Sequence, residues 1–209
     1  MAIALKSKKY DIIIDSKMII GILGNNYEEF IKSFRGESIY YLSKEKEPDL
    51  DIIEVDNKLD IDLEKILNKN RSDLSHSDQR LLQYVLMIQS NAKIIIIDEP
   101  YLYLDSKNKK KVSLLLNKLI KQGKTIIVGS NDTNIVYTLC KKVLLVNKRS
   151  IYYDNVDALS SKKILNKYHL EMPEILKFIS EAKRKKINLP YSKDIRDLIK
   201  DVYRNVSQK

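Results

Sequence analysis

Short apolar runs alternate with amphipathic segments over the first three quarters of the chain. The run "KIIIID" at residues 93–98 is short, continuous and β-branched, which is typical of a parallel strand covered on both faces. Further strands are predicted at 17–24, 124–129, 142–147 and 150–153. Apolar residues recur at helical spacing within 78–90, 106–123 and 133–140. For the helix at 106–123 we expect Ser106 as the N-cap and Gly123 as the C-terminal cap.

The alternation of strands and helices predicts an α/β fold with a mostly parallel sheet. After about residue 157 the pattern changes to helices alone, at 157–168, 173–186 and 193–205. We therefore predict a core domain over residues 1–156 and a small C-terminal helical extension over residues 157–209.

Acidic residues lie at the carboxyl ends of the predicted strands, where sheets of this kind usually place their functional sites. Asp98 and Glu99 end the run 93–98, and Ser130, Asn131 and Asp132 follow the next strand. A carboxylate in this place is suited to hold Mg²⁺ beside a phosphate, and a second one can orient or deprotonate a water. A pair of acids that caps a strand can equally be a solvated loop.

The composition is that of a globular protein, with 44% hydrophobic and 32% charged residues. No apolar run approaches the roughly 20 residues that cross a bilayer, and the first residues lack the pattern of a secretory signal. The single Cys140 excludes an internal disulfide and lies among apolar neighbours. We expect a buried, inert thiol in a reducing cytoplasm.

The net charge of +10 is concentrated near the end of the chain, with thirteen basic and six acidic residues in 161–209. The densest run is "KRKK" at 183–186. Such a run can bind nucleic acid or an anionic membrane, or it can be the solvated face of a helix. The aromatic residues that nucleic-acid platforms interleave with basic ones are absent around it, so we favour the solvated face.

The block from residue 74 to residue 105 resembles the signature-to-Walker-B block of ABC-type ATPases. Leu74, Ser75 and Gln79 stand in the signature region. The resemblance makes Asp98 the Walker B aspartate, which is a magnesium ligand, and Glu99 the catalytic glutamate. Leu104 and Asp105 match the end of the D-loop, and Asn131 stands at the position of the switch histidine.

This resemblance implies a P-loop NTPase-like ABC ATPase core with ATP and Mg²⁺ as its ligands. The interval before the signature is short, so we expect a reduced helical subdomain at about 37–90. Residues 171–202 resemble the C-terminal extension of energy-coupling-factor (ECF) transporter ATPases, which import vitamins and metals. This second resemblance implies that the extension is a dimerisation element. It also implies two partners, a second ABC ATPase subunit and a membrane transporter component, and a peripheral location on the cytoplasmic face of the membrane.

The phosphate loop departs most from the family pattern G-x-x-x-x-G-K-[ST]. Gly24 and Asn26 belong to its remnant, but no glycine follows Gly24 before Gly36. Glu28 and Glu29 stand where phosphates would approach, and like charges repel strongly in a dry site. Lys32 and Ser33 lie too far along the chain to replace the missing pair, so we interpret them as helix surface.

Other motif positions are also changed. No glutamine occurs before Gln79, so the Q-loop magnesium ligand is missing, and an acidic stretch at 45–65 stands there. His76 and Ser77 replace the two glycines of the signature, and His76 lacks a neighbouring histidine with which to bind a metal. Tyr10 is either the aromatic residue that stacks on adenine or a core tyrosine.

Three hypotheses follow. The leading one is a catalytically impaired ABC subunit that pairs with a competent ATPase and does not itself bind ATP and Mg²⁺ well. The second is an active ATPase with an atypical phosphate loop. The third is a nucleic-acid-associated ABC-like protein, suggested by the pI of about 9.4. The absence of a long coiled-coil insertion argues against the chromosome-maintenance branch of such proteins.

Overall fold

The structure is a computed structural model that describes residues 2–53, 59–148, 150–190 and 192–206. Residues 54–58 of the acidic stretch at 45–65 lie outside this part. Contacts divide the chain into two compact units, one of Met1–Ile20 with Glu28–Gly129 and the other of Gly21–Tyr27 with Ser130–Lys209. The predicted domain boundary at residue 156 stays a prediction.

A mostly parallel sheet confirms the predicted α/β class. Its six strands have the order β4-β5-β6-β3-β7-β8, and a separate two-stranded sheet is formed by β1 and β2. The strands are β1 Ala2–Lys6, β2 Asp11–Asp15, β3 Ile19–Leu23, β4 Ile39–Leu42, β5 Ile94–Asp98, β6 Thr125–Gly129, β7 Lys142–Val146 and β8 Ile151–Asn155.

In the first unit, β5 lies between two parallel neighbours, with Leu42 of β4 opposite Ile97 and Val128 of β6 opposite the same residue. Ile95, Ile96 and Ile97 are fully buried, as the continuous apolar run predicted for a strand covered on both faces. This register brings the ends of β4 and β6 level with the acidic end of β5.

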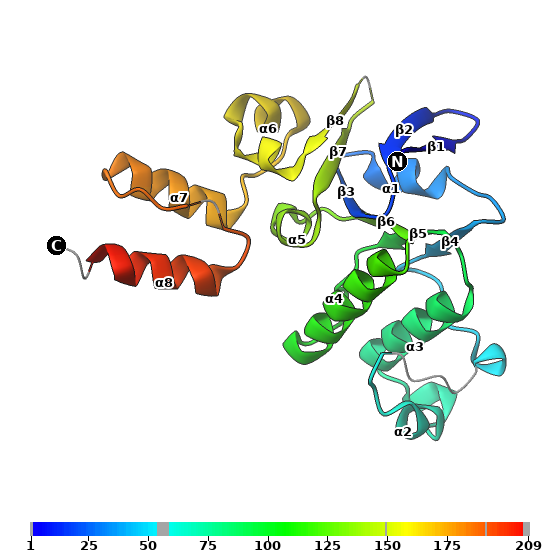
Figure 1. Cartoon of the computed structure of the whole chain (residues 1–209). Coiled ribbons are helices and arrows are strands. Elements are labelled where there is room, and N and C mark those ends of the chain that lie inside the picture. The colour runs from blue at the N-terminus through cyan, green and yellow to red at the C-terminus, as the bar shows by residue number, and fades with distance from the viewer. Residues whose placement is uncertain (1, 54–58, 149, 191, 207–209) are drawn as a thin grey trace. The chain divides into compact units, whose positions relative to one another are not determined.

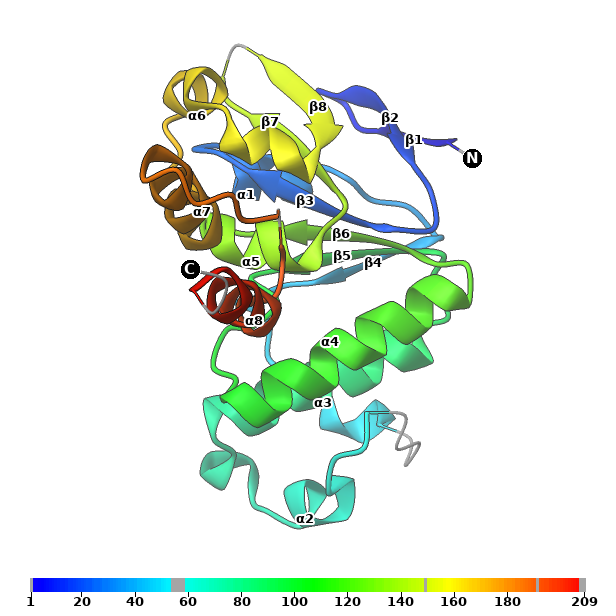
Figure 2. The same cartoon turned by 60° about the vertical axis from the view of Figure 1, so that its left-hand side comes forward.

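The helices of the first unit follow the predicted apolar stripes. Figures 1 and 2 both show α4 beside α3, and each buries one face through leucines such as Leu82 and Leu116. The helical elements of this unit are α1 Tyr27–Lys32 (which begins in the second unit), η1 Leu50–Ile52, α2 Leu63–Leu67, η2 Arg71–Asp73, α3 His76–Gln89 and α4 Ser106–Lys121. Among the described residues, no helix is both long and apolar enough to span a bilayer.

The N-cap of α4 differs from the prediction. Asp105, rather than Ser106, caps the helix, and its carboxylate accepts a hydrogen bond from the backbone N–H of Asn108 at 2.7 Å. The carboxylate reaches the N–H groups of the first turn and also suits the positive end of the helix dipole. Gly123 follows the helix with φ of +89°, which confirms the predicted C-terminal cap.

The second unit contains the antiparallel pair of β7 and β8 and most of the remaining helices. These are α5 Thr133–Leu139, η3 Val156–Ser160, α6 Lys162–Tyr168, α7 Glu174–Arg184 and α8 Ile195–Val206, so helices form where the tail pattern predicted them. The tail is tied to α5, since Glu174 N–H donates to Asn134 Oδ1 at 2.7 Å and Lys193 Nζ donates to the Cys140 carbonyl at 2.6 Å. Cys140 is buried, and burial raises the pKa of its thiol, as expected of an inert cysteine.

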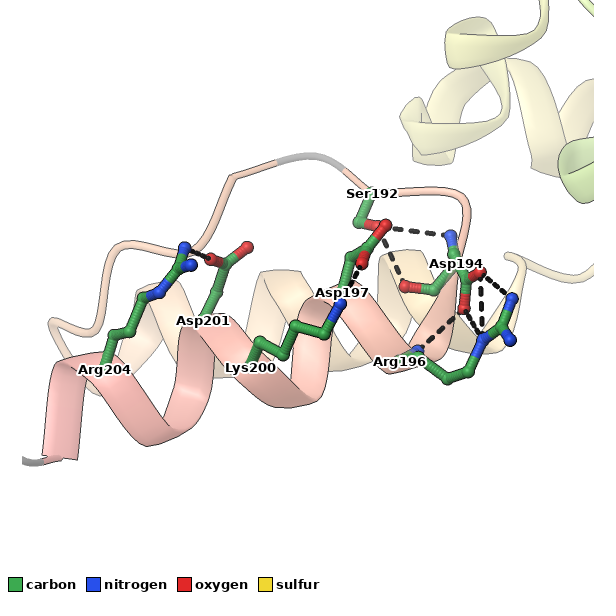
Figure 3. A network of polar contacts seen from close by, with 7 residues as sticks. All are labelled: Ser192, Asp194, Arg196, Asp197, Lys200, Asp201 and Arg204. Atoms are coloured by element: carbon green, nitrogen blue, oxygen red, sulfur yellow. Dashed lines mark hydrogen bonds and ion pairs between the residues drawn. The ribbon is translucent and has the colours of Figure 1, made fainter.

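A polar network fixes the start of α8 (Figure 3). The Asp194 carboxylate accepts from the backbone N–H of Arg196 at 2.8 Å and pairs with the Arg196 guanidinium, which lowers the pKa of Asp194 to about 2. The Lys200–Asp197 pair lies further along and is exposed, so it contributes little. The Arg204–Asp201 pair joins an exposed arginine to a half-buried aspartate. Asp194 is therefore the main polar anchor of the helix.

We expect the Asp194→Ala variant to fray α8, because the helix loses its N-cap, which is worth about 1 kcal/mol. Hydrogen exchange of the first-turn amides should accelerate about fivefold, in line with that energy. The Asp194→Asn variant keeps a capping side chain but loses the ion pair, and it should exchange nearly as slowly as the wild type. Equal acceleration in both variants would show that the ion pair, rather than the cap, holds the helix.

Candidate nucleotide site

The acidic end of β5 is a tight, buried turn. Asp98 is fully buried, and its Oδ2 atom lies 3.5 Å from the Tyr41 hydroxyl, which donates to it. Burial, followed by the charge of Asp98, raises the pKa of Tyr41, so the phenol stays neutral and remains a donor. Glu99 has φ of +48°, and its N–H donates to the Gly129 carbonyl at 2.9 Å.

A buried arginine that the sequence analysis did not single out holds this turn. Arg80 of α3 is 2% exposed, and its Nη2 atom donates to the carbonyls of Asp98 at 2.6 Å and Glu99 at 2.8 Å. Its Nη1 atom donates to the Ser43 carbonyl at 3.2 Å and to Gln83 Oε1 at 2.7 Å. One guanidinium therefore ties α3 to the ends of β4 and β5. The sequence offered one signal for this role: Arg80 is an arginine directly beside the leucines of the apolar stripe of α3.

Tyr84 of α3 anchors the next residue of the turn, Pro100, through its hydroxyl. It is fully buried and donates to the Pro100 carbonyl at 2.6 Å. Three consecutive carbonyls, those of Asp98, Glu99 and Pro100, thus accept side-chain donors from α3. The backbone that carries the two acids is rigidly positioned by hydrogen bonds that involve no ligand.

A lysine lies at the edge of this acidic turn. Lys44 follows β4, and its Nζ atom lies 2.6 Å from Oε1 of Glu28. Burial opposes the charge of Lys44, but the hydrogen bond to Glu28 and the charges of Asp98, Glu28 and Glu99 outweigh it and raise the pKa of the ammonium. A permanent cation thus stands beside the acids.

The remnant of the phosphate loop begins with a glycine that the backbone requires. Gly24 has φ of +119°, and a Cβ atom added there would lie 2.1 Å from the Val146 carbonyl oxygen. Its own carbonyl accepts from the N–H of Tyr27 at 3.0 Å, which starts the six-residue helix α1. Gly24 therefore has a structural reason to be glycine, independent of any nucleotide.

Counting from Gly24 along the phosphate-loop pattern places Phe30 at the lysine position and Ile31 at the hydroxyl position. Both side chains are fully buried. The Phe30 ring lies 4.6 Å from that of Tyr10 and 5.1 Å from that of Phe34, centroid to centroid. Of the two predicted roles for Tyr10, these contacts favour the core tyrosine. Lys32 ends α1 and pairs with the exposed Glu45 at 3.1 Å, as predicted for helix surface.

Asn26 lies in the second unit and faces another part of that unit. Asn25 and Asn26 line a cavity of 470 Å³ together with Asn147, Lys148 and His169. Of the described residues that line this cavity, none is a carboxylate, and Lys148 and His169 are exposed. Asn131 is exposed as well and directly precedes Asp132, whose carboxylate caps α5 by accepting from the N–H of Asn134 at 2.7 Å.

The residues of the signature region form the N-terminal cap of α3. Ser75 accepts from the N–H of Asp78 at 3.1 Å, while its own hydroxyl and N–H donate to the Asp78 carboxylate at 2.8 and 3.1 Å. The Gln79 side chain donates to the Leu74 carbonyl at 3.4 Å. His76 stacks on Tyr103 with ring centroids 4.8 Å apart. These contacts give Ser75, His76, Asp78 and Gln79 local partners.

Among the described residues, no three His, Cys, Asp or Glu side chains gather closely enough to hold a metal ion. The hydroxyl position of the phosphate loop is Ile31, which offers no ligand, and Lys44 already places a cation beside the acids. The oxygen ligands on offer are the carboxylates of Glu28, Asp98 and Glu99, and Lys44 stands among them. The described residues therefore do not fit a Mg²⁺ site of the ordinary composition.

The candidate residues fall into two groups. The first unit brings together Asp98 and Glu99 with Arg80, and separately Leu74, Ser75 and Gln79, while Asp105 caps α4. Gly24, Asn26 and Asn131 belong to the second unit. Their roles toward a nucleotide stay predictions.

Comparison with known proteins identifies the class. No protein-family model matches the chain. The solved structure of cbiO1 from Clostridium perfringens, described as part of the ABC transporter complex cbiONQ, matches with a TM-score of 0.55 and 17% identity over 82% of this chain and 90% of that one. A nucleotide-free ATP-binding cassette from an ABC transporter matches with a TM-score of 0.59 over 80% and 99% of the two chains. The fold is that of an ABC ATPase domain.

Sequence similarity narrows this class. An energy-coupling factor transporter ATP-binding protein, EcfA2 of Staphylococcus epidermidis, is 29% identical over 123 residues, which are 57% of this chain and 43% of that protein. EcfA3 of Oenococcus oeni is 26% identical over 144 residues, or 66% and 49% of the two chains. The chain is thus similar in sequence to ECF-type ATP-binding proteins, and it spans about half the length of these relatives or less.

We expect the Arg80→Met variant to lose about 2–4 kcal/mol of unfolding free energy, because it strips charged donors from the carbonyls of Ser43, Asp98 and Glu99, which are buried or half-buried. Arg80→Lys keeps the charge but cannot reach all four acceptors, so it should lose part of this amount. Urea denaturation measures both changes. The control is Arg71→Met, which removes an exposed arginine paired with exposed Asp51 and should shift the free energy by less than about 0.5 kcal/mol. A small, equal effect at both positions would contradict the anchoring role.

The capping box of α3 should make stability depend on pH. Burial alone would raise the pKa of Asp78, but hydrogen bonds from Lys69 and Ser75 outweigh it and lower the pKa. The stabilisation is therefore fully present above the ordinary carboxyl pKa of about 3.9 and is lost as the pH falls through the lowered folded value. Asp78→Asn should cost about 0.5–1 kcal/mol at pH 7 and progressively less below pH 4 in urea titrations. Asp73→Asn, an exposed acid nearby, is the control. A cost for Asp78→Asn that stays constant with pH would disprove the assignment.

Proposed function

We propose that the chain is a catalytically impaired ABC subunit of the ECF type. It would pair with a competent ATPase beneath a membrane transporter component, on the cytoplasmic face of the membrane, and support import of a small solute such as a vitamin or a metal. The relatives' names and the ABC fold support the class. The pairing, the location and the solute are inferences from that relationship.

The impairment is inferred mainly from two apolar residues in the phosphate-loop segment. Phe30 and Ile31 take the positions of the lysine and the hydroxyl that hold phosphate and magnesium, and both are fully buried. A lysine at position 30 would have to leave the Tyr10–Phe34 cluster to reach a phosphate. Electrostatic stabilisation of a triphosphate needs that cationic cradle before any carboxylate can act.

The C-terminal extension supplies a surface suited to the proposed second subunit. A groove of 880 Å³ runs along α5, α7 and α8, with Phe178, Ile199 and Tyr203 among the residues that line it. These three side chains are 49%, 48% and 70% exposed, although their helices also bury Leu176 and Leu198. Exposed apolar groups gathered along one groove commonly mark a protein contact. This supports, as our proposal, a dimerisation role for residues 157–209.

Nucleic-acid binding has less support. Residues 183–186 lie at the exposed end of α7, where Arg184 pairs with Glu181 at 2.6 Å. The run 183–186 is exposed, which agrees with the solvated helix face that the sequence favoured. The proposal therefore names a second ATPase subunit and a membrane component as partners.

Calorimetric titration with ATP and Mg²⁺ tests the impairment. We expect no saturable heat from the isolated chain at millimolar nucleotide, because no lysine or hydroxyl meets the phosphates. Micromolar binding would overturn the proposal and favour an active ATPase with an atypical loop. In that case Glu99→Gln should abolish turnover of the purified protein or of its co-purified complex, whereas an impaired chain should leave the turnover of such a complex within about twofold of the wild type.

A further inference from the structure

The end of β4 runs alongside the acidic end of β5. The parallel register ends with Leu42 opposite Ile97, so Ser43 leaves β4 at the level where Asp98 ends β5. Arg80 fixes this arrangement, since its guanidinium binds the Ser43 carbonyl at 3.2 Å and the Asp98 carbonyl at 2.6 Å. The residue after Ser43 is therefore held next to the acids by both the sheet and the arginine.

That residue is Lys44. Its side chain is only 23% exposed, and its Nζ atom lies 2.6 Å from Oε1 of Glu28, which is 40% exposed. Half-buried Lys44 thus has a carboxylate partner from α1 as well as the charges of Asp98 and Glu99 nearby, which help to raise the pKa of the ammonium. The four groups come from α1, β5 and the segments that follow β4 and β5.

The charges in this corner nearly balance without any metal. Glu28, Asp98 and Glu99 carry three negative charges, and Lys44 and Arg80 carry two positive ones. A lysine ammonium has three donors and no acceptor, so it cannot be a metal ligand. It instead repels a divalent cation that approaches the same carboxylates, and the repulsion is strong where water is partly excluded.

We propose that the Lys44 ammonium is the built-in counter-ion of the acidic turn and takes the place of a divalent cation there. It pairs with Glu28, neutralises the field of Asp98 and Glu99, and keeps Mg²⁺ out. The inference deepens the proposed impairment of this site. It adds that the chain excludes the metal by a specific cation of its own, in addition to lacking phosphate ligands.

Metal titration without nucleotide tests this inference. Mn²⁺ serves as the probe for Mg²⁺, and electron paramagnetic resonance counts the free ion. We expect weak binding by the wild type and binding about tenfold tighter or more by Lys44→Gln, because the amide removes the repelling charge and offers an oxygen. Adding Asp98→Asn to Lys44→Gln should abolish the gain, which places the new site at the acidic turn.

Matched variants separate local from general effects. Lys44→Arg keeps the cation and should bind Mn²⁺ as weakly as the wild type. Lys46→Gln removes the same charge two residues further on and should also change nothing. Circular dichroism with thermal unfolding verifies that each variant is folded, and Mn²⁺ should raise the melting temperature of Lys44→Gln alone.

Unchanged Mn²⁺ affinity in a folded Lys44→Gln variant would overturn the inference, as would tight binding by the wild type. Because no nucleotide is present, either result is independent of whether the chain binds ATP. A chain that bound ATP at micromolar concentration yet gained metal affinity in Lys44→Gln would lose the proposed impairment and keep this inference.

Discussion

The guanidinium of Arg80 is the interaction on which the acidic turn depends. It reaches from α3 to backbone carbonyls at the ends of both β4 and β5, and it does so from a position that is 2% exposed. A buried cation is costly unless its donors are satisfied, and here four acceptors satisfy both terminal nitrogens. Because three of the four acceptors are backbone carbonyls, Arg80 positions the backbone of Asp98 and Glu99 without binding their carboxylates.

The sequence predicted the parts of the fold that rest on burial alone. The isoleucines of β5, the stripe of α4 and the tail helices all formed near their predicted bounds, since apolar periodicity reports directly which face is buried. It did not single out β1, β2 or β4. β4 reads "IYYL", with tyrosines that lie half-buried beside β5, so neither a strict alternation nor a continuous apolar run marked it.

The candidate site was predicted less completely, for a physical reason. A sequence motif indicates which residue types could bind a ligand. Only the folded structure shows which of those side chains already have hydrogen-bond partners within the protein. Ser75 and Asp105 match family motifs, yet in this chain both side chains cap helices. Neither Arg80 nor Lys44 was assigned a role from the motifs, and the importance of each follows from contacts that only the folded chain brings together.

Phe30 in α1 and Lys44 after β4 illustrate how a fold can remain stable while its chemistry changes. Phe30 turns the lysine position of the phosphate loop into part of an aromatic cluster, which stabilises α1 through burial. That change removes a cation from the phosphate loop and would leave Glu28, Asp98 and Glu99 to repel one another. A lysine at position 44 restores the balance from the neighbouring strand, with its Nζ atom 2.6 Å from Glu28. The two acids at the end of β5 thus have a structural counter-charge, so their presence alone does not argue for catalysis.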